Sequence, residues 1–545
     1  MISNLYTLDL VLIKIKFYFY SVCLCLLANT SMAGELSFSI SPYIQETSPT
    51  GVKIRWERIL GNGAKVRVGK LNSDNELEFS SILLKKEVFR LHRKKLGLYE
   101  AEIDGLLPNT SYYYQVIQGD DQSSVYNFKT INDKRENFSF LVMADAQHGY
   151  EVTTRIVQES VIYHTFINNQ DRAIYPPRFS LFPGDLVQHG ILKRDWKKHF
   201  FNPLAPLLHR LAVYPVKGNH EMGRIFFNQY FSLPRQTSLK SHYNYYFFDY
   251  SNVRFINLDT TRAYRNKKQL KWLETALKEA EKSNEIDFIV LQFHHPYKSE
   301  AWNYGNTKFT GEIEKILVKS VRKHQKPIVY FNGHTHAYSR GHKLNSRLSM
   351  ITAGPIGGAI DTWDRGSKDY PEYHKTISQY GWVMVKVNAD KIDPRLEIIR
   401  FGFGNKNEFM DNGVIDRFII RKNSSAPERP SVIHAEIKDK EFRIQSTPFE
   451  NSESHLSTQI KVSYMKKRGK TSEEFFEFNS HNIYDGRDHR LTDDLTKMTI
   501  KINTMKRKSE DETISLQVRY RNNSLIWSDW SDRFLVINER AGELN

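Results

Sequence analysis

This 545-residue sequence has very little cysteine and almost no long apolar runs. Its two cysteines, Cys23 and Cys25, both lie in the longest uninterrupted apolar run, Phe17 to Leu27. Eleven apolar residues are too few to span a bilayer. If the run is removed on export, the remaining chain has no thiol. That excludes disulfides, thiolate metal sites and cysteine nucleophiles, and it leaves oxygen and nitrogen ligands for any metal.

Residues 1–33 are predicted to be a secretory signal peptide. Lys14 and Lys16 precede the apolar run, and Ser31-Met32-Ala33 satisfies the small-x-small rule for cleavage after Ala33. A secreted, periplasmic or extracellular location is therefore expected, with no transmembrane anchor left after cleavage. An uncleaved anchor or a misassigned start codon is the alternative.

The composition is that of a soluble globular protein, with 40% hydrophobic and 26% charged residues. Seventy-eight Lys and Arg against 62 Asp and Glu give a net charge of +16, which favours anionic partners. The densest basic runs, Lys85 to Lys95 and Lys466 to Lys470, contain no nucleic-acid motif. We interpret them as solvated faces, and no nucleic-acid partner is expected.

Three regions differ in their hydrophobic pattern. Residues 36–133 and 431–545 alternate apolar and polar side chains between frequent turn residues, which predicts a β-sandwich at each end. Residues 134–422 alternate nearly continuous apolar strands with amphipathic helices, such as Gln269 to Ala280 and Glu312 to His324. The predicted fold class is an α/β core flanked by two β-sandwich domains.

Both flanking regions resemble fibronectin type III modules. Leu107 to Tyr114 is similar to the turn and strand of such modules, in which a tyrosine packs over the corner. Trp527-Ser528-Asp529-Trp530-Ser531 resembles the WSxWS element, on whose tryptophans Arg519 and Arg521 can stack. We expect this element to serve the fold, and the C-terminal module is a candidate for binding a protein or a glycan.

Five short polar clusters in the middle region each lie at or just beyond the end of an apolar strand, where α/β folds bind ligands. They are Asp145-Ala146-Gln147, Gly184-Asp185, Gly218-Asn219-His220-Glu221, His294-His295-Pro296 and Gly333-His334-Thr335-His336. A lone histidine at such a place is more often structural than a ligand, but five clusters together favour a metal site. Carboxylate and amide oxygens with imidazoles suit Zn, Mn or Fe, and the number of donors indicates two ions.

The order of these clusters resembles the calcineurin-like metallophosphoesterases. An N-terminal sandwich followed by Gly333 to Tyr338 is similar, more specifically, to purple acid phosphatases, and the resemblance covers about residues 36–422. It implies a four-layer α/β/β/α core, two divalent or trivalent ions (Fe, Zn or Mn) and a phosphate-ester substrate. The implied reaction is hydrolysis of phosphomonoesters by in-line attack of a metal-generated hydroxide. A phosphodiesterase on the same site, or a non-catalytic surface or adhesion protein with a decayed core, are the alternatives.

The resemblance also implies a role for each residue of the clusters. Asp185 would bridge the two metals; Asp145 and His336 would bind the first, to which Gln147 could add its amide oxygen; Asn219, His294 and His334 would bind the second. His220 would donate a proton to the leaving oxygen or only anchor the phosphate, and Asp185 would serve catalysis through the metals. Glu221 would orient the His220 ring, and His295 would be structural.

Two positions depart from the family pattern. Gln147 stands where most metallophosphoesterases have a histidine, and its neutral amide oxygen is a weaker ligand than imidazole. Gln188 stands where purple acid phosphatases have the tyrosine whose phenolate gives them their colour, so the protein is not expected to be purple. His148 and His189 are possible substitute ligands.

Overall fold

The computed structural model describes residues 38–536 except 60–63, 84–85, 92–95, 222–224, 235–243, 405–411, 424, 439–440, 452, 466–470, 485–493 and 502–512. The predicted signal peptide, residues 1–33, and the basic run at 466–470 lie outside the described residues. None of the described helices is long and apolar enough to cross a membrane.

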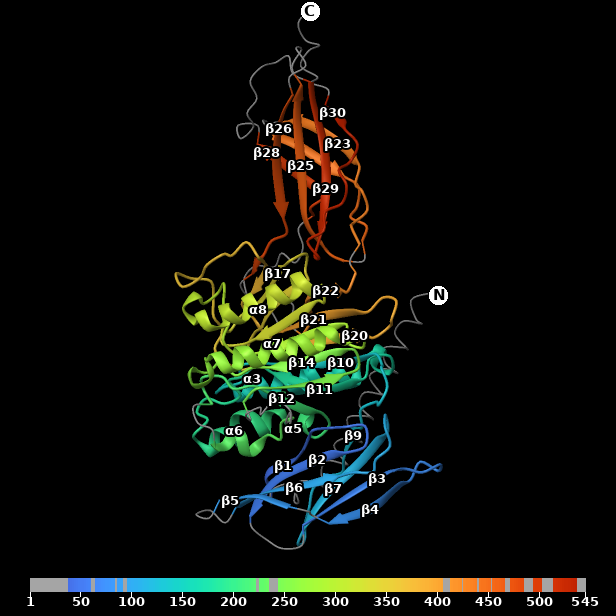
Figure 1. Cartoon of the computed structure of the whole chain (residues 1–545), viewed down its shortest axis with the longest axis vertical. Coiled ribbons are helices and arrows are strands. Elements are labelled where there is room, and N and C mark those ends of the chain that lie inside the picture. Colours follow the sequence, from blue (N-terminus) through green and yellow to red (C-terminus); the bar gives the residue numbers. More distant parts are fainter. Residues whose placement is uncertain are drawn as a thin grey trace, which may run out of the picture. The chain divides into compact units, whose positions relative to one another are not determined.

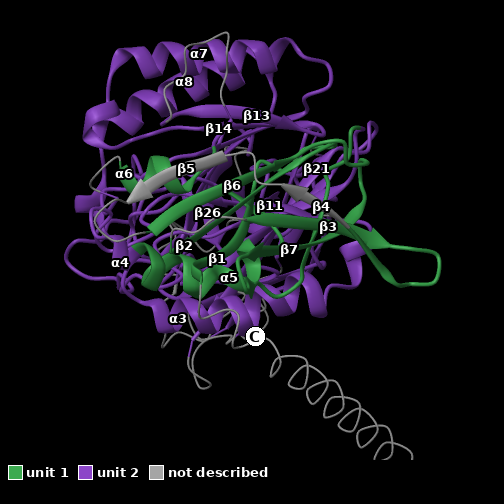
Figure 2. Ribbon diagram, turned by 90° about the horizontal axis from the view of Figure 1, so that it is seen from below, with its two compact units in different colours: residues 1–133, 196–213, 225–232 green, residues 134–195, 214–224, 233–545 purple. Residues whose placement is uncertain are grey.

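The chain forms two compact units, coloured separately in Figure 2. Unit 1 comprises residues 1–133, 196–213 and 225–232, and unit 2 comprises residues 134–195, 214–224 and 233–545.

Unit 1 contains two antiparallel sheets around one apolar core that includes Trp56, Val66 and Tyr114. One sheet has the order β1 (Phe38–Gln45), β2 (Val52–Ile59), β6 (Leu96–Ile103), β5 (Lys86–Leu91). The other has the order β4 (Leu77–Leu83), β3 (Lys65–Leu71), β7 (Ser111–Gln118), β8 (Asp121–Gln122), with β9 (Tyr126–Lys129) also paired to β7. The helical segments η5 (Trp196–Phe201), α5 (Asn202–Leu208) and α6 (Ile225–Tyr230) belong to the same unit. The predicted tyrosine corner is present, because the Leu107 N–H donates to the Tyr112 hydroxyl at 2.9 Å.

Unit 2 is built on two large sheets, and Figure 1 labels strands from both. The six-stranded sheet has the order β12 (Ala212–Pro215), β11 (Pro177–Phe182), β10 (Phe138–Val142), β20 (Tyr380–Asn388), β21 (Arg395–Phe403), β22 (Val414–Arg421). The eight-stranded sheet has the order β13 (Tyr246–Tyr250), β14 (Val253–Asn257), β15 (Phe288–Gln292), β16 (Ile328–Asn332), β18 (Leu348–Ala353), β17 (Tyr338–Lys343), β19 (Tyr373–Ile377), β27 (Ile483–Tyr484). Aromatic side chains join the sheets, since Phe140 of β10 lies 5.2 Å from Phe255 of β14, measured between ring centres.

Helices cover the outer faces of both sheets, which gives the four layers α/β/β/α. Helices α7 (Lys267–Lys282) and α8 (Lys308–His324) bury Leu273 and Leu317 against the eight-stranded sheet. On the six-stranded sheet, the indole of Trp382 donates to Ser160 of the segment η2 (Ile156–Val161). The remaining helical segments of unit 2 are short. They are α3 (Tyr150–Arg155), η3 (Tyr163–Ile167), η4 (Gln170–Ala173), α4 (Lys193–Asp195), η6 (Arg262–Tyr264) and η7 (Asn303–Gly305).

The C-terminal region is a second pair of antiparallel sheets, which fits the predicted fold class. One has the order β23 (Val432–Lys438), β24 (Glu441–Ser446), β28 (Lys497–Lys501), and the other β26 (Thr471–Asn479), β25 (His455–Met465), β29 (Thr513–Asn522), β30 (Phe534–Val536). The expected stacking of arginine on tryptophan is present. The guanidinium of Arg519 lies 4.5 Å from the ring centre of Trp527 and 4.4 Å from that of Trp530.

Candidate metal centre

The five polar clusters follow the ends of strands β10, β11, β12, β15 and β16 in unit 2. Two glycines bring the loops close together. Gly184 has φ +89°, and a Cβ there would lie 2.7 Å from the backbone nitrogen of Gly218. A Cβ on Gly218 would in turn lie 2.1 Å from Oδ1 of Asp185. Only glycine permits this backbone angle without strain and this closeness of approach.

Asp185 is the point at which the donors meet. Its Oδ2 lies 3.1 Å from Nε2 of His294 and 3.1 Å from Nε2 of Gln147, and its Oδ1 accepts the backbone N–H of His220 at 2.9 Å. Asn219 joins the same group, because its Oδ1 lies 3.0 Å from Nε2 of His294. The carboxylate therefore contacts residues from three of the four other clusters.

Asp145 supplies a second carboxylate to this group. Its Oδ1 accepts the His334 N–H at 3.0 Å and lies 3.8 Å from Nε2 of His336 and 4.0 Å from Nδ1 of His294. Its Oδ2 is buried and has no hydrogen-bond partner among the described residues. A buried carboxylate oxygen without a donor is costly unless a cation satisfies it, so this atom fits a metal ligand.

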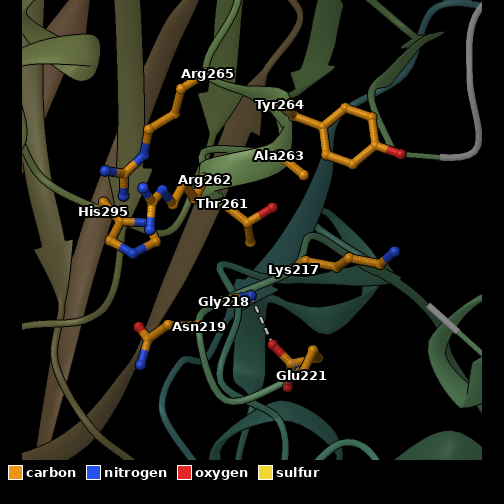
Figure 3. Close-up of a pocket in the computed structure, with 10 residues that line it drawn as sticks. All are labelled: Lys217, Gly218, Asn219, Glu221, Thr261, Arg262, Ala263, Tyr264, Arg265 and His295. Carbon is orange, nitrogen blue, oxygen red and sulfur yellow. Dashed lines mark hydrogen bonds between the residues drawn. The ribbon is translucent and has the colours of Figure 1, made fainter. Parts of the chain in front are cut away.

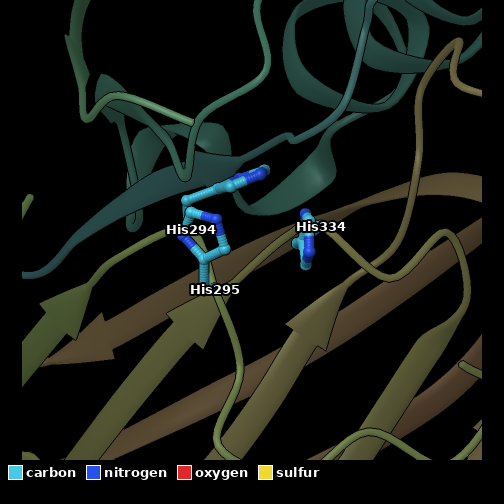
Figure 4. Close-up of side chains that lie close together, drawn as sticks. All are labelled: His294, His295 and His334. Atoms are coloured by element: carbon cyan, nitrogen blue, oxygen red, sulfur yellow. The ribbon is translucent and has the colours of Figure 1, made fainter. Parts of the chain in front are cut away.

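Two groups of side chains meet the spacing that a metal ion requires. Asp145, Asp185 and His294 form one, and His294, His295 and His334 form the other, with all ligand atoms of each group within 4.8 Å of one another. Figure 4 shows how the second group is built, with the consecutive His294 and His295 opposite His334 from the neighbouring loop. Carboxylates combined with imidazoles are a donor set that suits Zn, Mn and Fe.

The electrostatics of the centre reflect two buried carboxylates side by side. Burial alone would lower the pKa of His294, but Asp185 and Asp145 raise it to about 9. Burial and the positive charge on His294 lower the pKa of His334 to about 3. The carboxylates thus retain one positive charge on His294, with which a metal cation would compete, while His334 stays in the neutral form that binds metals.

Gln147 lies where the resemblance implies a ligand of the first metal. Its Nε2 is 3.1 Å from Asp185 Oδ2 and 3.1 Å from Nε2 of His336, whose Nδ1 faces the carbonyl of Ala359 at 2.6 Å. The side chain therefore touches both neighbouring ligand candidates. In this orientation it presents amide hydrogens to them, and a 180° rotation about its last bond would present the oxygen instead.

His220 lies beside Asp185, but Glu221 does not orient its ring as expected. Nδ1 of His220 is 2.8 Å from the carbonyl of Gln188, so the backbone holds the imidazole. The Glu221 carboxylate instead accepts the backbone N–H groups of Gly218 at 2.6 Å, Asp185 at 3.0 Å and Leu186 at 2.8 Å. The expectation rested on Glu221 being next to His220 in the sequence. In the fold, the Glu221 carboxylate lies closer to backbone N–H groups, and it binds those instead.

Three further histidines near the centre, His148, His189 and His295, have protein partners. His295 is buried, and its Nδ1 lies 3.0 Å from the Thr260 hydroxyl. His148 bonds to the Gln188 side chain at 3.1 Å, and Nδ1 of His189 lies 2.9 Å from the Asp195 carboxylate. Neither substitute ligand belongs to the two groups of metal-competent side chains.

A cavity of about 180 Å³ opens over the centre, and two of its lining residues were not predicted from the sequence. Asp361 accepts the backbone N–H of His336 at 2.8 Å, and the ring of Trp302 lies 5.1 Å from that of His334. Asp361 follows the glycine turn Gly357-Gly358, which was a usable signal. Trp302 lies in the segment 298–307, which the sequence places at the cleft without indicating that this tryptophan faces the centre.

Comparison with known proteins identifies two domains in this chain. Residues 138–338 match the family model of the calcineurin-like phosphoesterases, and residues 39–130 match that of the purple acid phosphatase N-terminal domain. An uncharacterised protein of Mycobacterium tuberculosis is 26% identical over 290 residues, which are 48% of this chain and 54% of that protein. Purple acid phosphatase 18 of Arabidopsis thaliana is 28% identical over 200 residues, 35% of this chain and 44% of that protein. The matches thus span about half the length of these relatives.

The fold also has a solved counterpart. The purple acid phosphatase PPD1 from yellow lupin (Lupinus luteus) seeds superimposes with a TM-score of 0.52 and 13% sequence identity, over 70% of this chain and 74% of that chain. At this identity the likeness concerns the fold alone. The family models and the strand-end cluster together show that this chain contains a calcineurin-like phosphoesterase domain preceded by a purple acid phosphatase N-terminal domain.

Proposed function

We propose that this protein is an exported, dinuclear metal-dependent phosphoesterase that hydrolyses phosphomonoesters. The observation that carries the proposal is the contact of Asp185 with both His294 and Gln147 at 3.1 Å, since these residues come from three separate strand ends. Matches to phosphoesterase and purple acid phosphatase families support the same reaction class.

The ligand sets follow the family resemblance, and contacts between their members support them. Asp145, Gln147 and His336 would hold one ion with Asp185, and Asn219, His294 and His334 would hold the other with the same carboxylate. Two cations bound there would neutralise phosphate oxygens and lower the pKa of a water molecule. A bridging carboxylate reduces the repulsion between such cations.

His220 has the geometry of a proton donor to the leaving oxygen. When protonated, it donates Nδ1–H to the Gln188 carbonyl, and its Nε2, 3.9 Å from Asp185 Oδ2, carries the other proton on a ring that lines the cavity. The fixed ring orientation places that proton without cost at the moment of reaction. In the hydrolysis, the P–O bond to the leaving group breaks, water oxygen bonds to phosphorus, and the proton passes to the leaving oxygen.

The domain limits belong to the same proposal: signal peptide 1–33, N-terminal sandwich 36–133, catalytic domain 134–422 and C-terminal sandwich 431–545. Both family matches fall inside the second and third of these ranges. Export is proposed from the predicted signal peptide, in which Lys14 and Lys16 precede the apolar run and Ser31-Met32-Ala33 follows it.

A non-catalytic binding protein is the second candidate, and one observation favours it. The Gln147 amide nitrogen contacts Oδ2 of Asp185 and Nε2 of His336, which are the atoms that would bind a metal at the first site. If that contact persists when metal is added, the first site stays closed and the second alone would hold metal.

One experiment separates these readings. The purified protein is analysed for metal, and hydrolysis of p-nitrophenyl phosphate and bis-p-nitrophenyl phosphate is measured with added Mn, Zn or Fe, with and without chelator. We expect about two ions per chain and chelator-sensitive turnover of the monoester. Metal below one ion per chain with no turnover supports the binding protein, and preference for the diester replaces the monoesterase with a phosphodiesterase.

A further inference from the structure

A second cavity adjoins the candidate metal centre. It has a volume of about 370 Å³, and Figure 3 shows its lining. Asn219 lines both this cavity and the smaller one over the centre. His295, on another wall, has its ring 4.5 Å from that of His334. A substrate whose phosphate lies at the centre can therefore extend past Asn219 into this space.

Two arginines, Arg262 and Arg265, line the cavity and point toward His295 in Figure 3. Nε of Arg265 donates to the Thr260 carbonyl at 2.7 Å, and the Thr260 hydroxyl bonds to the His295 ring. These contacts hold Arg265 beside the centre. Within the described residues, its terminal nitrogens make no hydrogen bond or ion pair, and neither does the exposed guanidinium of Arg262.

The two guanidinium groups are close enough to interact. Burial lowers the pKa of Arg265, Asp259 opposes that shift, and Arg262 adds to it. Two like charges placed together cost free energy that a bound anion recovers. Arginine also presents paired N–H groups in the geometry that phosphate and carboxylate oxygens accept.

The acidic groups nearby do not occupy these arginines. Glu221 lines the cavity, but its oxygens accept backbone N–H groups of Gly218, Asp185 and Leu186. Oδ1 of Asp259 accepts the N–H and the hydroxyl of Thr261. Asp259 offsets part of the charge of Arg265, and the charge of Arg262 remains for a ligand.

We propose that this cavity receives the leaving portion of the substrate and that Arg262 and Arg265 bind a second anionic group on it, a phosphate or a carboxylate. The proposal rests on the phosphoesterase function. It narrows the substrate class to phosphate esters and anhydrides whose leaving portion carries a second anionic group. Such a substrate would be held at both ends, by the centre and by the arginines.

Binding to the full-length, metal-loaded protein tests the site without turnover. Methylphosphonate carries one anionic group, while methylenebisphosphonate and phosphonoacetate add a phosphonate and a carboxylate respectively, and none has a P–O–C or P–O–P bond to hydrolyse. By calorimetry we expect at least one of the two larger ligands to bind about tenfold more tightly than methylphosphonate. Whichever gains affinity identifies the second group as phosphate-like or carboxylate.

The variants Arg262→Gln and Arg265→Gln should remove about tenfold of that gain, whereas Lys268→Gln should not. Lys268 is an exposed residue that loses the same charge but lies outside the cavity. The kinetic counterpart is the ratio of kcat/KM for pyrophosphate to that for p-nitrophenyl phosphate, which should fall about tenfold in Arg262→Gln and in Arg265→Gln but not in Lys268→Gln. Thermal unfolding of each variant reports whether it folds.

The two levels of the proposal fail separately. If the protein hydrolyses p-nitrophenyl phosphate but the affinity gain is absent, or is equal in wild type and Arg262→Gln, the anion site is wrong and the phosphoesterase stands. If the gain depends on Arg262 but no ester is hydrolysed with any metal, the anion site stands and the phosphoesterase is wrong.

Discussion

Four side chains of the candidate metal centre stand on left-handed backbone. The φ angles are +54° at Asp145, +45° at Gln147, +54° at Asp185 and +70° at His334. For residues other than glycine, this conformation costs about 1 kcal/mol or more each. The surrounding hydrogen bonds must outweigh that cost. In return, the left-handed turn at each strand end directs its side chain toward the common centre.

Asp185 is the residue on which the centre depends most. Asp185→Asn keeps the shape but removes the charge that faces His294 and would bridge two cations, so we expect loss of at least one ion per chain and a fall in turnover of at least about a hundredfold. Metal analysis and p-nitrophenyl phosphate hydrolysis measure both effects. Asp529→Asn, an exposed carboxylate in the C-terminal region, is the control. An Asp185→Asn protein that retains activity would contradict the assignment.

Gln147 offers a test in the opposite direction. Gln147→His restores the imidazole that most metallophosphoesterases have there, next to Asp185 and His336. Because neutral imidazole is a better ligand than an amide, the first metal should bind about tenfold more tightly. Competition with a chelator of known affinity measures this change. Unaltered retention in Gln147→His would mean that position 147 does not face a metal.

Glu221 supports the centre through the backbone rather than through His220. Glu221→Ala would leave the buried N–H groups of Gly218, Asp185 and Leu186 without their acceptor, which should destabilise unit 2 by about 3 kcal/mol. Glu221→Gln keeps one acceptor oxygen and should lose less. Urea unfolding of both variants and wild type gives the comparison. A wild-type midpoint for Glu221→Ala would show that other groups take over these donors.

At the scale of elements, the loop that follows β15 carries a pH-sensitive carboxyl. Burial raises the pKa of Glu300 from 4.5 to about 7, against hydrogen bonds from Thr376 of β19 and the Tyr370 N–H, and Asp369 adds to the rise. Because the folded state holds the proton more tightly than the unfolded chain does, its stability falls as pH rises from about 4.5 to about 7.

The expected size of this fall is about 3 kcal/mol, from the difference between the two pKa values. Glu300→Gln cannot ionise, so its unfolding free energy should vary less over the same interval, while Glu285→Gln, an exposed position, should behave as wild type. Urea titrations at pH 4.5, 6 and 7.5 provide the data. Parallel pH profiles for wild type and Glu300→Gln would disprove the linkage.

Buried strands and amphipathic helices were the elements easiest to predict from sequence. The strand expected at Phe288 to Leu291 is β15, Phe288–Gln292, because a run of apolar residues has no alternative but burial on both faces. The helix expected at Gln269 to Ala280 is α7, extended by two residues at each end beyond its apolar stripe. Trp272 and Ala276 are buried as well, so the covered face is wider than the periodic leucines indicated.

The site was predictable in its residues but not in its contacts. The strand-end position of the clusters indicated which donors would meet, since the ends of neighbouring strands share one edge of a fold. The contacts between individual donor atoms depend on the backbone angles of the turns. No residue pattern predicted the left-handed φ angles at Asp145 or His334. The same reason explains Glu221, whose partners are backbone groups and therefore leave no trace in the sequence.

At the scale of the molecule, the C-terminal region contributes a strand to the eight-stranded sheet as well as forming its own sandwich. Strand β27 pairs in parallel with β19, with Thr376 opposite Ile483 and Ile377 opposite Tyr484. It is the last strand of the eight-stranded sheet. The division at residue 430 inferred from composition therefore separates two strands that are hydrogen-bonded neighbours.

Deletion of residues 431–545 should leave the metal ligands in place but make the protein self-associate. Removing β27 frees the backbone groups of β19. Light scattering during size-exclusion chromatography should show higher oligomers, and Ile483→Pro in the full chain, which weakens the same pairing, should show a smaller shift toward them. A monodisperse truncated protein would show that β19 needs no cover.

The two residues of β27 thus cover one edge of β19, which would otherwise be open to pairing with another chain. An exposed edge strand can pair with strands of other chains, and natural proteins usually prevent this with charged residues, prolines or a covering loop. Because β27 and β19 belong to the same polypeptide, every molecule carries its own covering strand, and no second protein has to supply it.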